Sequence, residues 1–412
     1  MRKAILSVSL FNVISAGLAF CINIFLARYF SVELYGRINL LLSFTLIINT
    51  ISDLGFSNTN VIFNNKNKKS FSKEELLLAT KYYFKKNIPI VLLIGVLLII
   101  FFGLFFNLTS LEIGFLFIQG LLITFFRFLL SFHQAFGNWT TFNLLNLSLN
   151  VFKILFIGVS FCIPLFFKRE IFLTYNIVLI FLILACILSF VFSFVYTSDY
   201  IFLKSPSKIT TNLAQEFKKI WHPLIGINII IVLAMRSDTL IIQKFLGDTD
   251  LGIYSVANSL ALVFPLLTNS IMQVLLKETS DKGTSYLKRV LALQKKYALF
   301  IIMILIGVDF ISYNLIPIIF GNQYQLSIIY FQILIIAHAG GLIFTPLESY
   351  FYSKETKFIF YFKGIQLSII IVLSIAFIKI LGLLSVALAV LLSRVLGWFI
   401  LSIKSKKELK KI

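Results

Sequence analysis

Long apolar runs separated by short polar segments follow one another along the whole chain. A helix needs about 20 residues to cross roughly 30 Å of hydrocarbon, and the runs have about that length. The runs are Ala4–Ala27, Ile38–Asn60, Asn87–Asn107, Glu112–His133, Thr140–Phe161, Leu173–Tyr196, Trp221–Ile242, Gly252–Leu276, Tyr297–Ile319, Ser327–Tyr352, Phe358–Ile380 and Leu383–Ile403. The pattern predicts an all-α polytopic membrane protein with about 12 transmembrane helices. The turn between the last two runs is so short that a single re-entrant hairpin is an alternative there.

Composition leads to the same fold class. Of 412 residues, 59% are hydrophobic and 13% are charged, and the mean hydropathy is +0.96. A soluble protein of this size has too little interior to hide so much apolar surface. Lipid is therefore the expected solvent for most of the chain.

The basic residues predict the orientation of the helices. Most of the 37 Lys and Arg residues fall in alternate connections and at both chain ends, and such segments are typically cytoplasmic. The opposite connections hold only Arg28, Arg37, Lys168, Arg169, Lys244 and Lys379. Both termini are predicted to be cytoplasmic. The net charge of +20 then reflects this bias together with attraction to anionic membrane lipids.

No soluble ligand chemistry stands out in the sequence. The lysines are dispersed over several loops without an interleaved aromatic patch, so nucleic acid is not an expected partner. The three cysteines lack paired spacing, and the three histidines have no partner at i+3 or i+4. No Gly-x-x-x-x-Gly-Lys-Ser/Thr phosphate loop occurs. We expect neither a metal nor a cofactor.

The two halves of the chain resemble each other at an offset of 216 residues, most clearly between Leu26–Gly55 and Ile242–Ile271. The matched pairs include Arg28 with Lys244, Gly36 with Gly252, Ser43 with Ser259, and Asp53 with Asn269. The offset spans six predicted helices, an even number, so the repeats are parallel and form two six-helix bundles. The predicted domains are an N-terminal bundle (1–198), a cytoplasmic linker (199–220) and a C-terminal bundle (221–412).

Asparagines recur at helical spacing inside several runs, where a helix facing only lipid has no need of them. The candidate residues are Asn12, Asn23, Asn143, Asn146, Asn150, Asn258 and Asn269. In the fifth run, three of them and Lys153 share one helix face. Two interpretations stay open, namely hydrogen bonds that hold helices together and the wall of a water-filled cavity. Because charged residues accompany these faces, the cavity is favoured.

Eight ionisable residues within the runs are candidates for the site. The cations are Arg127, Lys153, Arg236 and Arg394, and the acids are Asp53, Asp238, Asp309 and Glu348. A charge at the bilayer centre costs about 2.5 to 3.5 kcal/mol on insertion scales, so each needs a partner or water. Mutual neutralisation is one interpretation. The other is a cavity whose cations bind an anion such as phosphate, with the acids as proton or sodium sites that couple transport to an ion gradient.

Arg236 and Asp238 cannot pair along their own helix, because two residues place their side chains about 200° apart. We predict that Arg236, which shares a face with Thr239 and Gln243, faces the cavity. Asp238 is predicted to face a neighbouring helix.

Three segments resemble the bacterial polysaccharide-unit flippases of the Wzx type, in the multidrug/oligosaccharidyl-lipid/polysaccharide exporter superfamily. They are "FLARYFSVELYGRINLLLSFTLIINTISDLGFS", "SDTLIIQKFLGDTDLGIYSVANSLALVFPL" and "PLESYFYSKETKFIF". The resemblance implies alternating access between two six-helix bundles. It also implies an undecaprenyl-diphosphate-linked O-antigen or capsule unit as cargo, moved from the inner to the outer leaflet of the bacterial cytoplasmic membrane. A polysaccharide polymerase is a further candidate partner.

Other functions fit less well. A cation-coupled multidrug exporter of the same superfamily shares the fold, but acids would then be expected to outnumber cations in the cavity. A polymerase or ligase would need catalytic groups outside the membrane, and the predicted outer loops are too short for a separate domain. We therefore do not expect an enzyme. A scaffold that transports nothing would not need ionisable groups at membrane depth.

Overall fold

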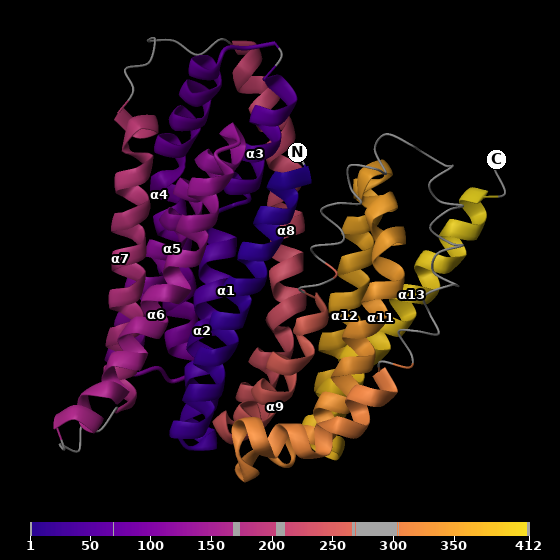
Figure 1. Ribbon diagram of the computed structural model, residues 1–412. Helices are drawn as coiled ribbons and strands as arrows, with labels where there is room; N and C mark the ends of the chain where they lie inside the picture. The colour runs from indigo at the N-terminus through magenta and orange to yellow at the C-terminus, as the bar shows by residue number, and fades with distance from the viewer. Residues whose placement is uncertain are drawn as a thin grey trace. The chain divides into compact units, whose positions relative to one another are not determined.

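The computed structural model consists of helices, and it contains no strand in the residues it describes, which are 2–68, 70–167, 174–202, 211–265, 268, 303 and 305–409. The first half contains α1 (Arg2–Tyr29), α2 (Val32–Ser52), α3 (Phe56–Asn67), α4 (Lys73–Phe105), α5 (Ser110–Phe136), α6 (Trp139–Phe167) and α7 (Tyr175–Phe202). The second half contains α8 (Thr211–Leu246), α9 (Asp248–Ala261), an apolar helix Leu305–Phe320, the 3-10 helix η1 (Asn322–Tyr324), α11 (Ser327–Lys354), α12 (Thr356–Leu381) and α13 (Leu383–Leu409) (Figure 1).

Ten helices in the described part of the chain are long and apolar enough to cross a membrane. The predicted fold class, an all-α multi-pass membrane protein, is confirmed. Three predicted spans, Leu173–Tyr196, Gly252–Leu276 and Tyr297–Ile319, include residues outside the described ranges. The last two runs form separate helices, α12 and α13, which are divided at Gly382 by a left-handed backbone (φ 54°). Each is long enough to span by itself.

The run Ile38–Asn60 was predicted as one span, but the structure breaks it. α2 stops at Ser52, and Leu54 and Gly55 then have φ values of 50° and 72°. These left-handed conformations cannot continue a right-handed helix. Hydrophobic periodicity concealed the break, although the Asp53-Leu54-Gly55 sequence carried a recognisable turn signal.

Asp53 stabilises the start of α3 after this break. Its carboxylate accepts hydrogen bonds from the Ser57 backbone N–H at 3.1 Å and from the Ser57 hydroxyl at 2.7 Å. The first N–H groups of a helix lack intrahelical partners, and a carboxylate also complements the helix dipole there. Irregular backbone at membrane depth is tolerated where protein surrounds it, and Gly55 is buried here.

The segment predicted as a linker, 199–220, is helical at both ends. α7 continues to Phe202 and α8 begins at Thr211, ten residues before the predicted start of the span. The reason is apolar burial, because Leu213 and Phe217 on the added turns are 2% and 0% exposed. The residues between these helices lie outside the described ranges.

The chain divides into two compact units. Unit 1 comprises residues 1–22 and 41–232, and unit 2 comprises residues 23–40 and 233–412. α1 and α8, the first helix of each predicted repeat, both run from unit 1 into unit 2. The predicted domain boundaries at 198 and 221 stay a prediction, since the units follow spatial packing and not the order of the repeats.

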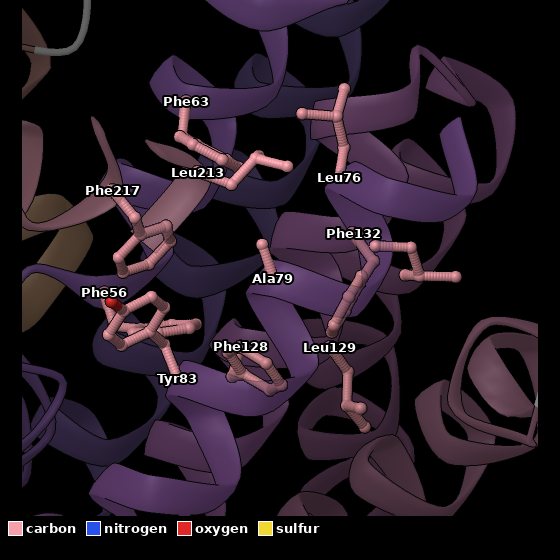
Figure 2. Close-up of a cluster of buried hydrophobic side chains, with 11 residues drawn as sticks. Phe56, Phe63, Leu76, Ala79, Tyr83, Phe128, Leu129, Phe132, Leu213 and Phe217 are labelled. Carbon is pink, nitrogen blue, oxygen red and sulfur yellow. The ribbon is translucent and has the colours of Figure 1, made fainter. Parts of the chain in front are cut away.

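Aromatic side chains form a large part of the core of unit 1, where α3, α4, α5 and the start of α8 meet (Figure 2). Tyr83 stacks on Phe217 with ring centroids 4.5 Å apart, and Phe56 lies 5.0 Å from Phe128. Phe217 also lies 5.4 Å from Phe56. Such aromatic pairs add about 0.5 to 1.5 kcal/mol each beyond the area they bury. This cluster fixes the first turns of α8 within unit 1.

Unit 2 is held together by α9, α11, α12 and α13, with α11 packed on α9 and α13 (Figure 1). A methyl group on Gly340 of α11 would overlap the Trp398 indole of α13, so a glycine is needed there. The Trp398 ring also stacks on Phe344, one turn further along α11. The remaining intramembrane charges of this unit lie on α8, on the helix Leu305–Phe320, and on α11, α12 and α13.

Candidate functional site

The two predicted cations of unit 1 lie on adjacent helices, α5 and α6. Arg127 is exposed although the residues on either side of it, Phe126 and Phe128, are buried. It interacts electrostatically with Asp53, but no carboxylate of the described residues forms an ion pair with it. Lys153 is half-buried and likewise has no carboxylate at ion-pair distance among the described residues.

A positive charge in either position needs water or an anion to stabilise it. Exposure of Arg127 to hydrocarbon would cost several kcal/mol, and Lys153 would need a long reach to the interface from the middle of α6. An aqueous space inside the protein removes that cost. Both cations therefore need a polar or anionic environment at membrane depth.

Unit 2 contains the other two predicted cations, Arg236 on α8 and Arg394 on α13. The Nε atoms of both side chains are buried and have no hydrogen-bond partner in the described part of the structure. Both arginines interact electrostatically with Asp238 and Tyr254, so the structure brings the two into one neighbourhood. Neither forms an ion pair with a carboxylate of the described residues.

The acids of this neighbourhood are already engaged by other groups. The Tyr254 hydroxyl donates to Asp238 at 2.8 Å, and the Thr239 backbone N–H donates to it at 2.7 Å. Asp238 therefore faces the neighbouring helix α9, as predicted. Glu348 on α11 forms an ion pair with Lys363 on α12 at 2.6 Å. The guanidinium groups of Arg236 and Arg394 thus keep donors to offer to an anion.

Tyr254 and Lys363 are parts of this site that the sequence did not reveal. The predicted orientation left Lys363 among the lysines on the cytoplasmic side, but its side chain is 16% exposed and forms an ion pair with Glu348. Its position six residues inside the apolar run Phe358–Ile380 was an available signal. Tyr254 had no such signal, because only the fold places it opposite Asp238.

Four of the predicted asparagines, Asn12 on α1 and three on α6, join α1 to α6 inside unit 1. Asn143 donates to Ser7 at 3.0 Å, and Asn146 donates to Asn12 at 3.1 Å. Asn150 donates to the Ser15 hydroxyl at 2.8 Å and to the Ser15 carbonyl at 3.0 Å. We refer to these contacts as the α1–α6 ladder. They match the interhelical interpretation, and lining of a cavity by the same residues stays a prediction.

The other predicted site residues are not brought into these groups. Asn23 is half-buried and Asn258 is buried, and neither side chain forms a hydrogen bond with the described residues. Asp309, half-buried in the helix Leu305–Phe320, has no ion pair with them either. Asn269 lies outside the described ranges. Within those ranges, no group of three or more His, Cys, Asp and Glu side chains could hold a metal ion.

A crevice beside Asp53 is too small for a headgroup. Its walls include Phe84, Phe128 and Trp221, they are almost wholly apolar, and it has room for about one water molecule. The Trp221 indole donates to the Leu54 carbonyl at 2.8 Å, which satisfies a backbone group of the helix break. The crevice therefore belongs to the packing around this break.

Comparison with known proteins identifies the class of protein to which the chain belongs. The model of the family described as "Polysaccharide biosynthesis protein" matches residues 1–276. The chain belongs to this family, which is part of the multidrug/oligosaccharidyl-lipid/polysaccharide exporter superfamily of flippases and transporters. No curated protein matches the chain.

Solved structures share the fold over nearly the whole chain. A lipid II flippase, MurJ, in an inward closed conformation, is 20% identical, with a TM-score of 0.74 over 97% of this chain and 87% of that one. A point mutant of the MATE transporter VcmN of Vibrio cholerae is 11% identical, with a TM-score of 0.65 over 100% and 97%. An inward-facing multidrug resistance MATE transporter is 10% identical, with a TM-score of 0.64 over 96% and 95%.

Proposed function

We propose that the protein translocates undecaprenyl-diphosphate-linked oligosaccharide repeat units, of O-antigen or capsule, from the inner to the outer leaflet of the bacterial cytoplasmic membrane. Both termini are cytoplasmic in this proposal. The two halves work by alternating access, so that the headgroup passes through the protein while the lipid tail stays in the bilayer. Family membership supports a flippase or transporter as the general class.

The observation that carries the proposal is an excess of intramembrane cations over free carboxylates. Lys153 has no acidic partner among the described residues, and Arg236 and Arg394 keep buried, unbonded Nε atoms while the nearby acids bind other groups. A diphosphate carries negative charge on several oxygens, and arginine binds such oxygens bidentately. A flippase of lipid II among the structural neighbours is in keeping with a lipid-linked cargo.

The proposal assigns separate tasks to the charged and amide side chains. Arg127, Lys153, Arg236 and Arg394 bind the diphosphate, and asparagines not engaged between helices, such as Asn23 and Asn258, donate to sugar hydroxyls. Asp53, Asp238, Asp309 and Glu348 are the candidates for coupling to protons or sodium ions. A polysaccharide polymerase is the proposed consumer of the translocated unit.

A cation-coupled multidrug exporter of the same superfamily is the second candidate. The fold similarity to MATE transporters favours it. The charge pattern argues against it, because an organic cation needs carboxylates or aromatic faces free to receive it. Asp238 and Glu348 are engaged by Tyr254 and Lys363 instead.

Complementation tests the proposal. The chain is expressed in cells that lack their own repeat-unit flippase and that make a defined lipid-linked unit. We expect polysaccharide to return to the cell surface when the unit is the one native to this protein. Failure with the native unit, with the protein present in the membrane, would reject the proposed cargo, and dye efflux from the same cells then tests the exporter.

A further inference from the structure

The starts of α4 and α8 are polar and extend beyond the length that a membrane span needs. The two helices have 33 and 36 residues, whereas about 20 are enough to cross the hydrocarbon. After Lys86, α4 carries no Lys, Arg, Asp or Glu up to its end at Phe105, and α8 carries none between Lys219 and Arg236. Lys86 and Lys219 therefore lie at the boundary between headgroups and hydrocarbon.

The two polar starts pack against each other inside unit 1 (Figure 2). Tyr83 of α4 stacks on Phe217 of α8 with ring centroids 4.5 Å apart, and its hydroxyl donates to the Ala214 carbonyl at 2.9 Å. Trp221, one turn after Phe217, lies 6.4 Å from the Tyr83 ring. In both helices the polar start precedes the apolar part, so both enter the membrane from the same side. Tyr83 and Phe217 therefore mark one common level along α4 and α8.

Two pairs of lysines follow directly after this common level. They are Lys85 and Lys86 on α4, and Lys218 and Lys219 on α8, and all four side chains are exposed. Since a helix rises about 1.5 Å per residue, each lysine lies within about 5 Å of the Tyr83–Phe217 level. Lys81, one turn before Lys85, adds a further positive charge that repels it. We refer to the four residues as the lysine pairs.

The carboxylates of the polar starts do not neutralise the lysine pairs. Glu216 forms an ion pair with Lys66 of α3 at 3.4 Å. Glu74 and Glu75 lie at the first turn of α4, at least about 15 Å before Lys85 along the helix, and Glu75 is part of the capping box there. None of the four lysines forms an ion pair with the residues that the structure describes. Positive charge is therefore concentrated at the membrane boundary of α4 and α8.

We propose that the lysine pairs bind the phosphate headgroup of an anionic phospholipid, which bridges α4 and α8. A lysine carries its charge on a flexible stem, so from the boundary it reaches the level of the lipid phosphates. Attraction to anionic lipid falls off within a Debye length of about 8 Å, and all four lysines lie within that distance of the boundary. The position at this boundary favours a lipid over a soluble anion. The site does not depend on the proposed cargo.

Fluorescence of Trp221 tests the site, because this residue lies within one turn of Lys218 and Lys219. The other two tryptophans, Trp139 and Trp398, are replaced by phenylalanine. The purified full-length protein is placed in vesicles of phosphatidylcholine and phosphatidylglycerol, with bromine atoms on the acyl chains of one lipid or the other. Bromine quenches only nearby indoles, so the two quenching curves give the preference for the anionic lipid beside Trp221.

We expect a preference for phosphatidylglycerol of about tenfold or more with all lysines present. Lys85→Gln/Lys86→Gln should lower it by about threefold, the same change in the α8 pair should do likewise, and the quadruple variant should bring it close to one. Lys406→Gln/Lys407→Gln, an exposed lysine pair at the end of α13, is the matched control and should leave it unchanged. Equal quenching by both lipids without any lysine replaced overturns the site, as does an equal loss in the control or a preference that survives in the quadruple variant.

A second measurement applies if the tryptophan replacements prevent folding. Phosphatidylglycerol added to the detergent-solubilised protein with its native tryptophans should raise the melting temperature of the wild type and of the control alike, because a ligand that binds the folded state stabilises it. The quadruple variant should gain less. An equal gain in that variant contradicts the proposal.

A competitor distinguishes the phospholipid from the cargo. Unbrominated polyprenyl diphosphate is added to the vesicles in the same small amount as unbrominated phosphatidylglycerol. If only the diphosphate abolishes the preference, the lysine pairs belong to the cargo pathway and the phospholipid site is wrong; equal effects of the two lipids support the site. Neither measurement follows transport, so failure of the site leaves the proposed function to be decided by complementation.

Discussion

Lys153 is the residue whose charge is hardest to explain without an anionic ligand. It lies in the middle of α6, directly after the α1–α6 ladder, and no carboxylate of the described residues is at ion-pair distance. An ion pair would have neutralised it, and a position at the helix end would have let it reach the interface. Neither applies, so water or cargo is the remaining source of stabilisation.

Replacing Lys153 by alanine should impair export strongly while the protein still inserts. The change removes a cation that binds phosphate, and it breaks no ion pair with another described residue. Lys379→Ala, at an exposed helix end, is the control and should leave export unchanged. Surface polysaccharide and the amount of protein in the membrane are measured together, and full export by Lys153→Ala would remove this residue from the mechanism.

Tyr254→Phe tests whether Asp238 must be kept from the arginines. Without the hydroxyl, Asp238 loses its 2.8 Å hydrogen bond, and the nearest cations, Arg236 and Arg394, become its alternative partners. We expect reduced export with normal folding, because an arginine paired to Asp238 is less available to phosphate. Wild-type export in this variant would show that the tyrosine is only structural.

At the scale of the elements, the break between α2 and α3 depends on one glycine. Gly55 has φ 72°, and a Cβ atom there would lie 2.9 Å from the Asn228 amide and 3.2 Å from the Leu224 backbone. Gly55→Ala should lower the free energy of unfolding by about 1 to 2 kcal/mol for the backbone alone. Thermal unfolding in detergent measures this, with Gly114→Ala in α5 as the control, since its added methyl meets nothing. Equal melting temperatures for Gly55→Ala and Gly114→Ala would contradict backbone strain at Gly55.

The α1–α6 ladder separates two roles for asparagine. A double-mutant cycle with Asn12→Ala and Asn146→Ala should give a coupling energy of about 0.6 kcal/mol in thermal unfolding, as interhelical hydrogen bonds in membranes do. Export should fall only as far as the loss of folded protein explains. Zero coupling with a selective loss of export would instead assign these residues to the cargo pathway.

Periodicity and length were sufficient to predict the helices, because lipid forces each span to satisfy its own backbone. They missed the break at Asp53, Leu54 and Gly55, because hydrophobicity read over the 20 residues of a span does not register a turn of three residues. They also began α8 too late, because its first turns are amphipathic and pack in unit 1 through Phe217.

Among the site residues, the sequence predicted the intramembrane charges but not their partners. The i to i+2 spacing of Arg236 and Asp238 was enough to exclude a direct pair along the helix. Tyr254 opposite Asp238 and Lys363 opposite Glu348 come from different helices, and only tertiary packing determines such contacts. The asparagine stripe on α6 was recognised, yet periodicity could not distinguish a neighbouring helix from a cavity.

At the scale of the whole molecule, a duplicated helical fold carries cations within its membrane-spanning helices that form no ion pair with carboxylates of the described residues. Gly36 and Gly252, which the predicted repeat pairs with each other, lie in direct backbone contact between α2 and α9. Family membership places the chain among flippases and transporters, and the charges are the reason to propose a diphosphate-linked cargo.

The most direct measurement is translocation of a fluorescent polyprenyl-diphosphate saccharide in vesicles that contain the purified protein. A membrane-impermeant reductant bleaches the dye in the outer leaflet, so dye that crosses from the inner leaflet is bleached as well. The account predicts nearly complete bleaching with the wild-type protein, and bleaching of the outer leaflet alone in protein-free vesicles and with the double variant Lys153→Ala/Arg236→Ala. Outer-leaflet bleaching alone with wild-type protein, or complete bleaching with the double variant, would contradict it.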